Sequence, residues 1–386
     1  MPDVDPYFGQ LLHRLRLERG LSLRGLGQLA HRAKSHLHEL ETGRKQPSAE
    51  VARHLDRVLG ANGRLAAVID AAPSAHDEAE AVELARLVEA SGISPDALDR
   101  IECAVDDLAS RYATTPPGDL LPLIRTHLAQ VGRLLLVRST LDQHRRLLVA
   151  GGWLALLRAT VHIDLRHRAA ADIDLATATQ LARHAGHREL QAWCLETHAW
   201  DVLTGGDYRL ARDLSRQAQA IAPRGGSAYI QATAQEGRAW ARMGDRRETR
   251  LVLGRIDRLV SPLPTPDRPE HHYRYDPGKA LSYTATTLAW AGDPAAEEYA
   301  RAVVADLDGT DRPRRTASAR LDLGLALLAA DKPDEASAAA QAAIISGRVV
   351  ASNWWRATEV VTGVEATGVG GAKDLRDAYE AYRPGR

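Results

Sequence analysis

The sequence predicts an all-α protein, with a compact five-helix domain at the N-terminus and an array of helical repeats after it. Three observations support this prediction. Leu, Ala and Arg dominate the 386 residues, aromatic residues contribute 5%, and runs of β-branched residues are few. Apolar residues recur at helical spacing along most of the chain. Short Gly, Pro and Asp signals separate these runs, as they do between helices.

Composition and charge exclude several classes of protein. No run of eighteen or more apolar residues is present and the N-terminus lacks a signal-peptide pattern, so we expect a cytoplasmic protein without a membrane partner. Cys103 and Cys194 are too few for a disulfide framework or a zinc site. The net charge is zero, but residues 1–70 hold eleven Lys or Arg against eight Asp or Glu, and residues 77–107 are acidic. This contrast indicates one face for nucleic acid and another for a different partner.

The first predicted helix begins at Asp5-Pro6, because Asp is a suitable cap and Pro suits the first helical position. Its buried side is predicted to consist of Leu11, Leu12, Leu15 and Leu17. Further along, Ser48 is predicted to cap a fourth helix over residues 51–59. A short fifth helix is expected over residues 65–69.

Between these helices, residues 21–48 predict two short helices joined by a tight turn. Ser22 is a good cap for the first, and the second begins near Ala33 or Lys34. The apolar residues at helical spacing are Leu23, Leu26, Leu29 and Ala30 in the first helix, and Leu37 and Leu40 in the second. Gly43 follows where a left-handed residue is needed. Two helices so close in sequence cross steeply, which leaves the outer face of the second free to enter a DNA major groove.

Together with residues 14–20, this stretch resembles the helix-turn-helix domain of the XRE (phage-repressor-like) family, over about residues 7–69. The matching pieces are Arg16-x-x-x-Gly20-Leu21-Ser22, Leu26-Gly27 and Leu37-x-x-Leu40-Glu41-x-Gly43-x-x-x-Pro47-Ser48. The resemblance implies double-stranded DNA as a partner. It also implies an ion pair between Arg16 and Glu41 that ties the first helix to the third. Because a buried pair is costly to break from one side, both residues are interpreted as structural.

The resemblance also identifies candidate DNA contacts. The candidates for reading bases are Lys34, Ser35 and Glu39, with His36 and His38 nearby. Lysine suits a guanine edge or a phosphate, and glutamate suits a cytosine amino group. The expected phosphate contacts are Ser22, Arg44 and Lys45. The alternative is an ordinary solvated helix face, which we would favour without the flanking motif; with the motif, DNA contact is favoured.

Three residues depart from the family pattern. His31 occupies the usual place of a turn glycine, and Ala33 the usual place of a capping Ser or Thr. Gly25 falls inside the second helix at a cost of about 1 kcal/mol against alanine. Gly27, in contrast, occupies a position that must be small for helix packing. These departures motivate an alternative function, a protein-interaction scaffold whose helix-turn-helix head has lost DNA binding.

Residues 71–78 lack apolar anchors and predict a linker. The predicted domains are therefore a DNA-binding domain over residues 1–72, a linker over 73–80 and a repeat domain over 81–386. The first helix expected in the repeat domain begins at Val82, with Leu84, Leu87 and Val88 on one face. The next helices are expected over residues 96–111, 120–137, 141–150 and 153–165.

Turn signals then recur along the repeat domain. Asp207, Asp245 and Asp293 directly follow glycines, and Asp331 lies in a weaker copy of the same pattern; the four are spaced by 38, 48 and 38 residues. This spacing is somewhat longer than the period of about 34 residues in tetratricopeptide repeats. With Ala and Gly at the helix crossings, the segment resembles a tetratricopeptide α-solenoid.

The longest interval between turns contains residues 261–277, where five prolines forbid a continuous helix. His271, His272, Tyr273 and Tyr275 are candidates for ligand contact there, because loops carry binding groups on rigid scaffolds. The open alternative is a surface connection whose aromatics pack on the solenoid. Trp354, one of two adjacent tryptophans, is a further candidate for a ligand or partner, or for a terminal cap. A metal site, a cofactor and a catalytic constellation are not expected, so the protein is not predicted to be an enzyme.

The best prediction is a sequence-specific transcription regulator that binds DNA as a homodimer. Its repeat domain would bind a peptide, small-molecule or protein effector. XRE heads joined to tetratricopeptide bodies resemble peptide-responsive quorum-sensing receptors, and similar architectures are typical of actinobacterial regulators. The Ala/Arg-rich, Lys-poor composition suits a high-GC genome.

Overall fold

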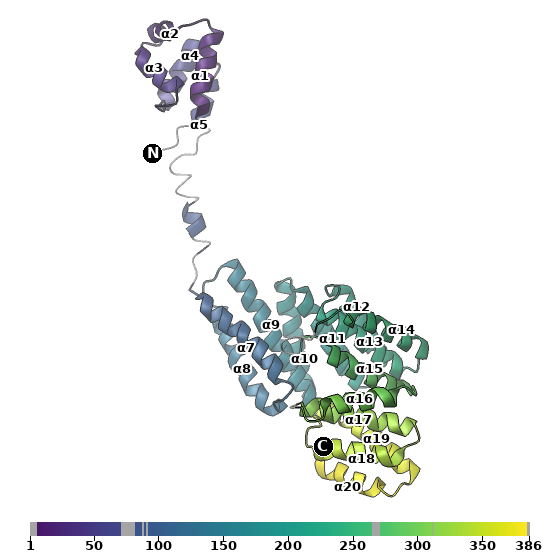
Figure 1. Cartoon of the computed structure of the whole chain (residues 1–386). Helices are drawn as coiled ribbons and strands as arrows, with labels where there is room; N and C mark the ends of the chain where they lie inside the picture. The colour runs from purple at the N-terminus through teal and green to yellow at the C-terminus, as the bar shows by residue number, and fades with distance from the viewer. Residues whose placement is uncertain are drawn as a thin grey trace. The chain divides into compact units, whose positions relative to one another are not determined.

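The computed structural model describes residues 6–70, 82–86, 89, 92–264, 271–310 and 312–383. Every regular element in these ranges is a helix, so the predicted fold class is confirmed. The chain forms two compact units, Met1–Ala90 and Ser91–Arg386 (Figure 1). The predicted linker over residues 73–80 lies outside the described residues.

Residues 6–70 of the first unit form five helices around one apolar core. They are α1 (Pro6–Glu18), α2 (Leu23–Leu29), α3 (Lys34–Glu41), α4 (Ala49–Leu59) and α5 (Arg64–Asp70). Phe8, Leu11, Leu12 and Leu15 of α1 are buried at helical spacing. The prediction that Leu17 belongs to this stripe is wrong, because Leu17 lies on the opposite face of α1 and is 56% exposed.

Local capping signals in the first unit act as predicted. The Ser22 hydroxyl accepts the backbone N–H of Gly25 at 3.0 Å, and the Ser48 hydroxyl accepts that of Val51 at 3.3 Å. Gly43 has φ +71° just after α3. Gly9 has a role that the sequence did not reveal. A Cβ there would lie 2.6 Å from the carbonyl oxygen of Glu41, so α1 and α3 touch backbone to backbone at this point.

The second unit consists of fourteen α-helices and one 3₁₀ turn within the described ranges. They are α7 (Pro95–Arg111), α8 (Pro117–Leu134), α9 (Leu141–Asp164), α10 (Arg168–His184), α11 (Arg188–Thr204), α12 (Tyr208–Ile221), α13 (Ser227–Arg242), α14 (Arg246–Val260), α15 (Pro277–Ala291), α16 (Ala296–Leu307), α17 (Pro313–Ala329), α18 (Pro333–Ile345), η1 (Ala351–Asn353), α19 (Trp354–Thr367) and α20 (Ala372–Tyr382). From α9 onward, neighbouring helices pack as successive pairs (Figure 1).

The predicted break between residues 150 and 153 is wrong, because α9 runs without interruption through Gly151 and Gly152. These glycines serve close packing. A Cβ on Gly152 would lie 2.6 Å from the side chain of Leu190, and one on Gly151 would lie 3.2 Å from that of Val131. Among the described helices, α9 is the one long and apolar enough to cross a membrane, and 78% of its apolar window is buried inside the protein. It is the central core helix of this part of the fold.

Each helix pair turns through one left-handed residue. These residues are Arg166 (φ +61°), Gly206 (+95°), Gly244 (+76°), Gly292 (+60°), Asp331 (+57°) and Gly368 (+70°). The first and the last belong to pairs that the sequence pattern did not reveal. Asp207 and Asp245 cap α12 and α14, whereas Asp331 itself takes the left-handed conformation. The unit is therefore a helical repeat-like domain of six pairs, preceded by α7 and α8.

Candidate functional site

The outer face of α3 is the first candidate site. Leu37 and Leu40 are fully buried against the core of the first unit. The five predicted base-contacting residues are Lys34, Ser35, His36, His38 and Glu39. Lys34, Ser35 and His38 are exposed, and His36 and Glu39 are partly exposed. At 100° per residue, positions 35, 38 and 39 lie opposite the two buried leucines. The face is therefore open to a partner and bears hydrogen-bonding side chains of several kinds.

Exposed basic residues follow directly after this face. The backbone N–H groups of Arg44 and Lys45 both donate to the carbonyl oxygen of Glu39, at 2.8 and 3.2 Å, and so fix the turn at the end of α3. The side chains of both basic residues are exposed. Ser22, at the start of α2, is exposed as well and already caps its helix. The three predicted phosphate contacts thus lie at the ends of the two helices.

Arg16 and Glu41 hold α1 to α3. Arg16 Nε and Nη2 donate to the two carboxylate oxygens of Glu41 at 2.6 and 2.9 Å, and Arg16 Nη1 donates to the Leu21 carbonyl at 2.8 Å. The His13 ring adds a contact of 2.8 Å to Glu41, which the sequence did not reveal. Burial alone would raise the pKa of Glu41, but the bonds from Arg16 and His13 hold it below its ordinary value. This network sets the position of α3.

The turn between α2 and α3 keeps its shape despite the departures from the family pattern. His31 takes the left-handed conformation, with φ +49°, in the place of the usual glycine. Ala33 forms no side-chain cap for α3. Gly27 packs directly against the turn, since a Cβ there would lie 2.8 Å from the carbonyl oxygen of Arg32. The turn is thus formed at some cost in backbone strain.

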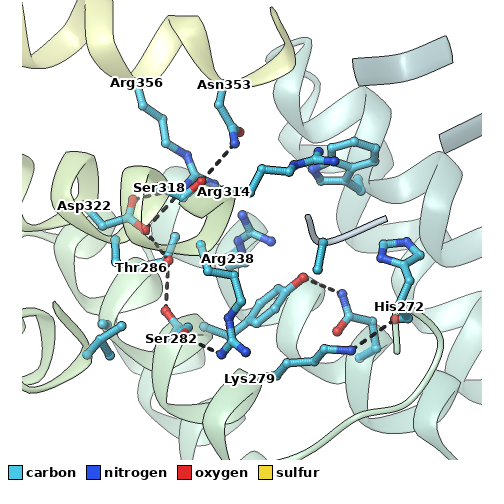
Figure 2. A pocket seen from close by; sticks show the side chains of 18 of the residues that line it. Arg238, His272, Lys279, Ser282, Thr286, Arg314, Ser318, Asp322, Asn353 and Arg356 are labelled. Carbon is cyan, nitrogen blue, oxygen red and sulfur yellow. Dashed lines mark hydrogen bonds and ion pairs between the residues drawn. The ribbon is translucent and has the colours of Figure 1, made fainter. Parts of the chain in front are cut away.

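The second candidate site is a cavity of about 230 Å³ in the helical repeat-like unit. The first helices of five successive pairs, α11, α13, α15, α17 and α19, contribute to its walls. Figure 2 shows Arg356 and Asn353 on one side, facing Asp322 and Ser318, and Lys279 beside His272. Asn353 donates to Ser318 at 3.1 Å.

Basic groups outnumber acidic groups in the lining of this cavity. The basic residues are Arg238, Lys279, Arg314, Arg315 and Arg356, and the acidic residues are Asp164, Glu196 and Asp322. Arg314 pairs with Asp164, and Arg356 reaches Asp322 at 3.3 Å. Burial raises the pKa of the third acid, Glu196, to about 7. At neutral pH this carboxyl is therefore only partly ionised, and the cavity has an excess of positive charge.

Arginines surround one tryptophan beside the cavity. The guanidinium groups of Arg238, Arg242 and Arg356 lie 4.8, 4.6 and 5.0 Å from the ring centroid of Trp290. Arg238 also lies 4.7 Å from the ring of Tyr283. Such cation–π contacts hold a guanidinium group in place without neutralising its charge.

Of the five predicted ligand contacts, the structure places only His272 in the cavity lining. Tyr273 packs on Trp153 and Trp193 at ring distances of 4.7 and 5.2 Å. Tyr275 is buried in a separate apolar cluster around α13 and α14. For both tyrosines, packing on the solenoid is the interpretation that the structure supports.

The other two predicted ligand contacts are also buried elsewhere. His271 contacts Asp106 at 3.2 Å, and burial lowers the pKa of this histidine to about 4. Trp354 packs on Tyr379 at 5.6 Å and donates to the Val349 carbonyl at 3.1 Å. Trp354 therefore belongs to the apolar core between α19 and α20.

The arginines that line the cavity were not predicted from the sequence. One signal for them existed: Gln231, Gln235 and Arg238 recur at helical spacing within a helix whose other residues are mostly small and apolar. A polar stripe on a buried helix indicates an internal polar site. Among the described residues, no group of three or more His, Cys, Asp and Glu side chains is arranged to hold a metal ion.

The first unit is thus a helix-turn-helix domain, and the second is a helical repeat-like domain. Residues 8–68 match the family model of a helix-turn-helix domain. None of the curated proteins compared with the chain matches it.

Two solved structures align with the chain at low identity. PlcR from Bacillus thuringiensis, in complex with the peptide PapR7 and DNA, is 13% identical with a TM-score of 0.28, over 66% of this chain and 94% of that chain. The apo form of the competence regulator ComR from Streptococcus vestibularis is 12% identical with a TM-score of 0.33, over 95% of this chain and 100% of that chain.

Proposed function

We propose that this protein is a sequence-specific DNA-binding transcription regulator of the XRE type, whose DNA binding is modulated by a ligand of its helical repeat domain. The observation that carries the proposal is the helix-turn-helix match over residues 8–68, together with the exposed polar face of α3. The proposal includes no catalytic step, cofactor or metal, and the protein acts in the cytoplasm.

In this proposal α3 enters the major groove and reads bases. Lys34 contacts a guanine edge or a phosphate, and Glu39 accepts a hydrogen bond from a cytosine amino group. Ser22, Arg44 and Lys45 contact phosphates, which set the register of the domain on the duplex. The Arg16–Glu41 ion pair supports this mode of binding, because it fixes the recognition helix on α1.

A single helix-turn-helix domain contacts too few bases for useful specificity. We therefore infer that two copies of the chain bind a two-fold symmetric site, with half-sites about one helical turn, or roughly 34–36 Å, apart. The helical repeat domain, which we interpret as tetratricopeptide-like, would provide the dimer interface, the ligand site or both. The cavity in that domain supports the ligand role.

The alternative function is a protein-interaction scaffold whose head no longer binds DNA. The left-handed His31 and the missing cap at Ala33 favour this alternative, because both weaken the turn that positions α3.

Selection of genomic fragments by the purified full-length protein tests the proposal. We expect enrichment of a two-fold symmetric site, which a Lys34→Ala/Glu39→Ala variant loses or relaxes. A Lys332→Ala/Glu297→Ala variant is the matched control, because it removes one exposed Lys–Glu pair from the second unit. Absence of enrichment at low salt, both alone and with cell extract as a source of effector, would favour the scaffold.

A further inference from the structure

Arg238 is a buried cation that the described part of the fold leaves without a carboxylate. Its side chain lies on α13, lines the cavity and is only 4% exposed. Its Nη1 donates to the neutral amide oxygen of Gln235 at 3.0 Å, and its Nε has no hydrogen-bond partner among the described residues. The rings of Tyr283 and Trp290 hold the guanidinium group by its faces.

Arg356 adds a second incompletely paired guanidinium to the same cavity. It is 5% exposed, its Nε is also without a partner among the described residues, and it shares the Trp290 ring with Arg238. Its one carboxylate partner in the part of the chain that the structure describes, Asp322, lies at 3.3 Å, which is long for a charge-assisted bond. Burial, reinforced by the nearby Arg238 and Arg242, lowers the pKa of Arg356 to about 10. The structure therefore concentrates positive charge here.

A buried charge without a counter-ion is strongly unfavourable, and buried arginines in proteins are nearly always paired. Glu196, the remaining acid in the lining, cannot neutralise Arg238 fully because its pKa is raised to about 7. A bound anion would supply the missing charge. The planar fork of a guanidinium group matches the paired oxygens of a carboxylate or a phosphate.

The size of the cavity limits the ligand. At about 230 Å³ it is smaller than the 300–1,000 Å³ that is usual for drug-sized ligands. A small organic anion fits this volume better than an extended peptide. Ala300 and Val303 of α16 and Ala319 of α17 add apolar wall to the lining, which suits a short carbon skeleton.

We propose that the cavity binds a small organic anion, with its carboxylate or phosphate group held by Arg238 and Arg356. This inference deepens the proposed function. Only the role of the anion as the effector of DNA binding rests on that proposed function. Binding itself does not depend on the helix-turn-helix domain.

Thermal unfolding of the full-length protein tests the inference, with succinate and inorganic phosphate as probes. Sodium chloride at equal ionic strength and the neutral compound succinamide are the references. We expect one anion to raise the Tm by about 2–4 °C or more above both references, because a ligand of the folded state stabilises it. A larger response to succinate indicates a carboxylate ligand, and a larger response to phosphate indicates a phosphorylated one.

Substitutions test whether the rise in Tm with anion depends on the arginines. Arg238→Met keeps an unbranched stem between Tyr283 and Trp290 but removes the charge. We expect it to raise the Tm without anion and to abolish the response to anion. Arg242→Met is the matched control, because Arg242 packs on the same tryptophan but pairs with Glu359 at 2.8 Å and does not line the cavity. It should keep the response. Arg356→Met should weaken the response independently of Arg238.

Three outcomes would overturn the inference: no anion exceeds the references, Arg238→Met keeps the full response, or Arg238→Met lowers the Tm without anion. Failure of the proposed function has a different signature. A protein that selects no DNA but responds to an anion through Arg238 retains this binding site and loses only its regulatory role.

Discussion

The guanidinium group of Arg314 lies 4.2 Å above the ring of Tyr112, which precedes it by 202 residues. The same group donates to the Tyr112 hydroxyl at 2.9 Å and pairs with Asp164. Asp164 in turn accepts the Ser352 hydroxyl at 2.8 Å. The ends of α7 and α9 are thus joined to the start of α17 and to η1. Because all four segments border the cavity, this contact holds its walls together.

Arg314→Leu is expected to destabilise the second unit by about 3–5 kcal/mol, because it leaves the fully buried Asp164 carboxylate without its cation. Urea unfolding of the full-length protein, followed by tryptophan fluorescence, measures this effect. All seven tryptophans lie in the second unit, so the signal reports on that unit alone.

The control for this prediction is Arg250→Leu. Arg250 is 71% exposed and pairs with Asp293 at 3.4 Å, so its loss should cost no more than about 1 kcal/mol. Equal effects of the two substitutions would show that the Arg314 contact does not hold the unit together.

The raised pKa of Glu196 predicts that the free energy of unfolding declines as the pH rises. Burial raises its pKa from 4.5 to about 7, although Gln231 donates to its carboxylate at 2.9 Å. The folded state therefore binds this proton more tightly than the unfolded state. The contribution of this proton to the free energy of unfolding is fully present below pH 4.5 and is lost as the pH rises to about 7. It amounts to at most about 3 kcal/mol. We expect Glu196→Gln to flatten the decline and to stabilise the protein at pH values above 7.

Glu236 on the neighbouring helix α13 should behave in the opposite way. Burial alone would raise its pKa, but Gln219 at 3.0 Å, and Arg216 and Arg255 at 2.8 Å, hold the pKa below 4.5. Its contribution is present above pH 4.5 and is lost as the pH falls further. Glu236→Gln should therefore destabilise the protein at neutral pH, by about 1–3 kcal/mol. Urea unfolding between acid and mildly alkaline pH compares both variants, and parallel profiles would contradict the assignment.

Two glycines of α2 should respond oppositely to alanine. A Cβ on Gly25 would lie no closer than 3.5 Å to its neighbours, so Gly25→Ala should stabilise the first unit by about 0.5–1 kcal/mol. Gly27→Ala should destabilise it, because the new Cβ would lie 2.8 Å from the carbonyl oxygen of Arg32. Hydrogen exchange of peptides from residues 23–41 measures both changes in the full-length protein. Stabilisation by both substitutions would show that the turn relaxes easily.

Features of local origin could be read from the sequence. Ser22, Ser48 and Gly43 act within a few residues of their own position, so capping and turn chemistry were sufficient to predict them. The position of α3 after the turn, and the face that it exposes, were predicted from the same local pattern. The six-pair repeat was predicted in part, because the turn at Arg166 uses a residue that carries no turn signal.

Features that depend on distant segments could not be read in this way. In the sequence, Gly151 and Gly152 resemble a helix break. In the fold they are small because the side chains of Val131 and Leu190 occupy the space beside them. The aromatic residues at 271–275 depend on distant packing in a similar way: Tyr273 and Tyr275 have apolar partners far away in sequence, whereas His272 borders the cavity. The charge of Arg238 is significant only because no described carboxylate reaches it.

The basic residues after α3 provide a test of the proposed DNA binding by the first unit. If Lys45 contacts a phosphate, Lys45→Ala should weaken binding about equally for all DNA sequences. It should also reduce the slope of log K against log salt by about 0.9 per protomer, since one fewer counterion is released. Arg44→Ala should act in the same way, whereas Lys34→Ala/Glu39→Ala should change sequence preference. Fluorescence anisotropy with selected and scrambled DNA over a range of salt concentrations separates these effects. Arg224→Ala, in the second unit, is the control for loss of one positive charge. A Lys45→Ala variant that shifts sequence preference at an unchanged salt slope would move Lys45 from the phosphate backbone to the base edges.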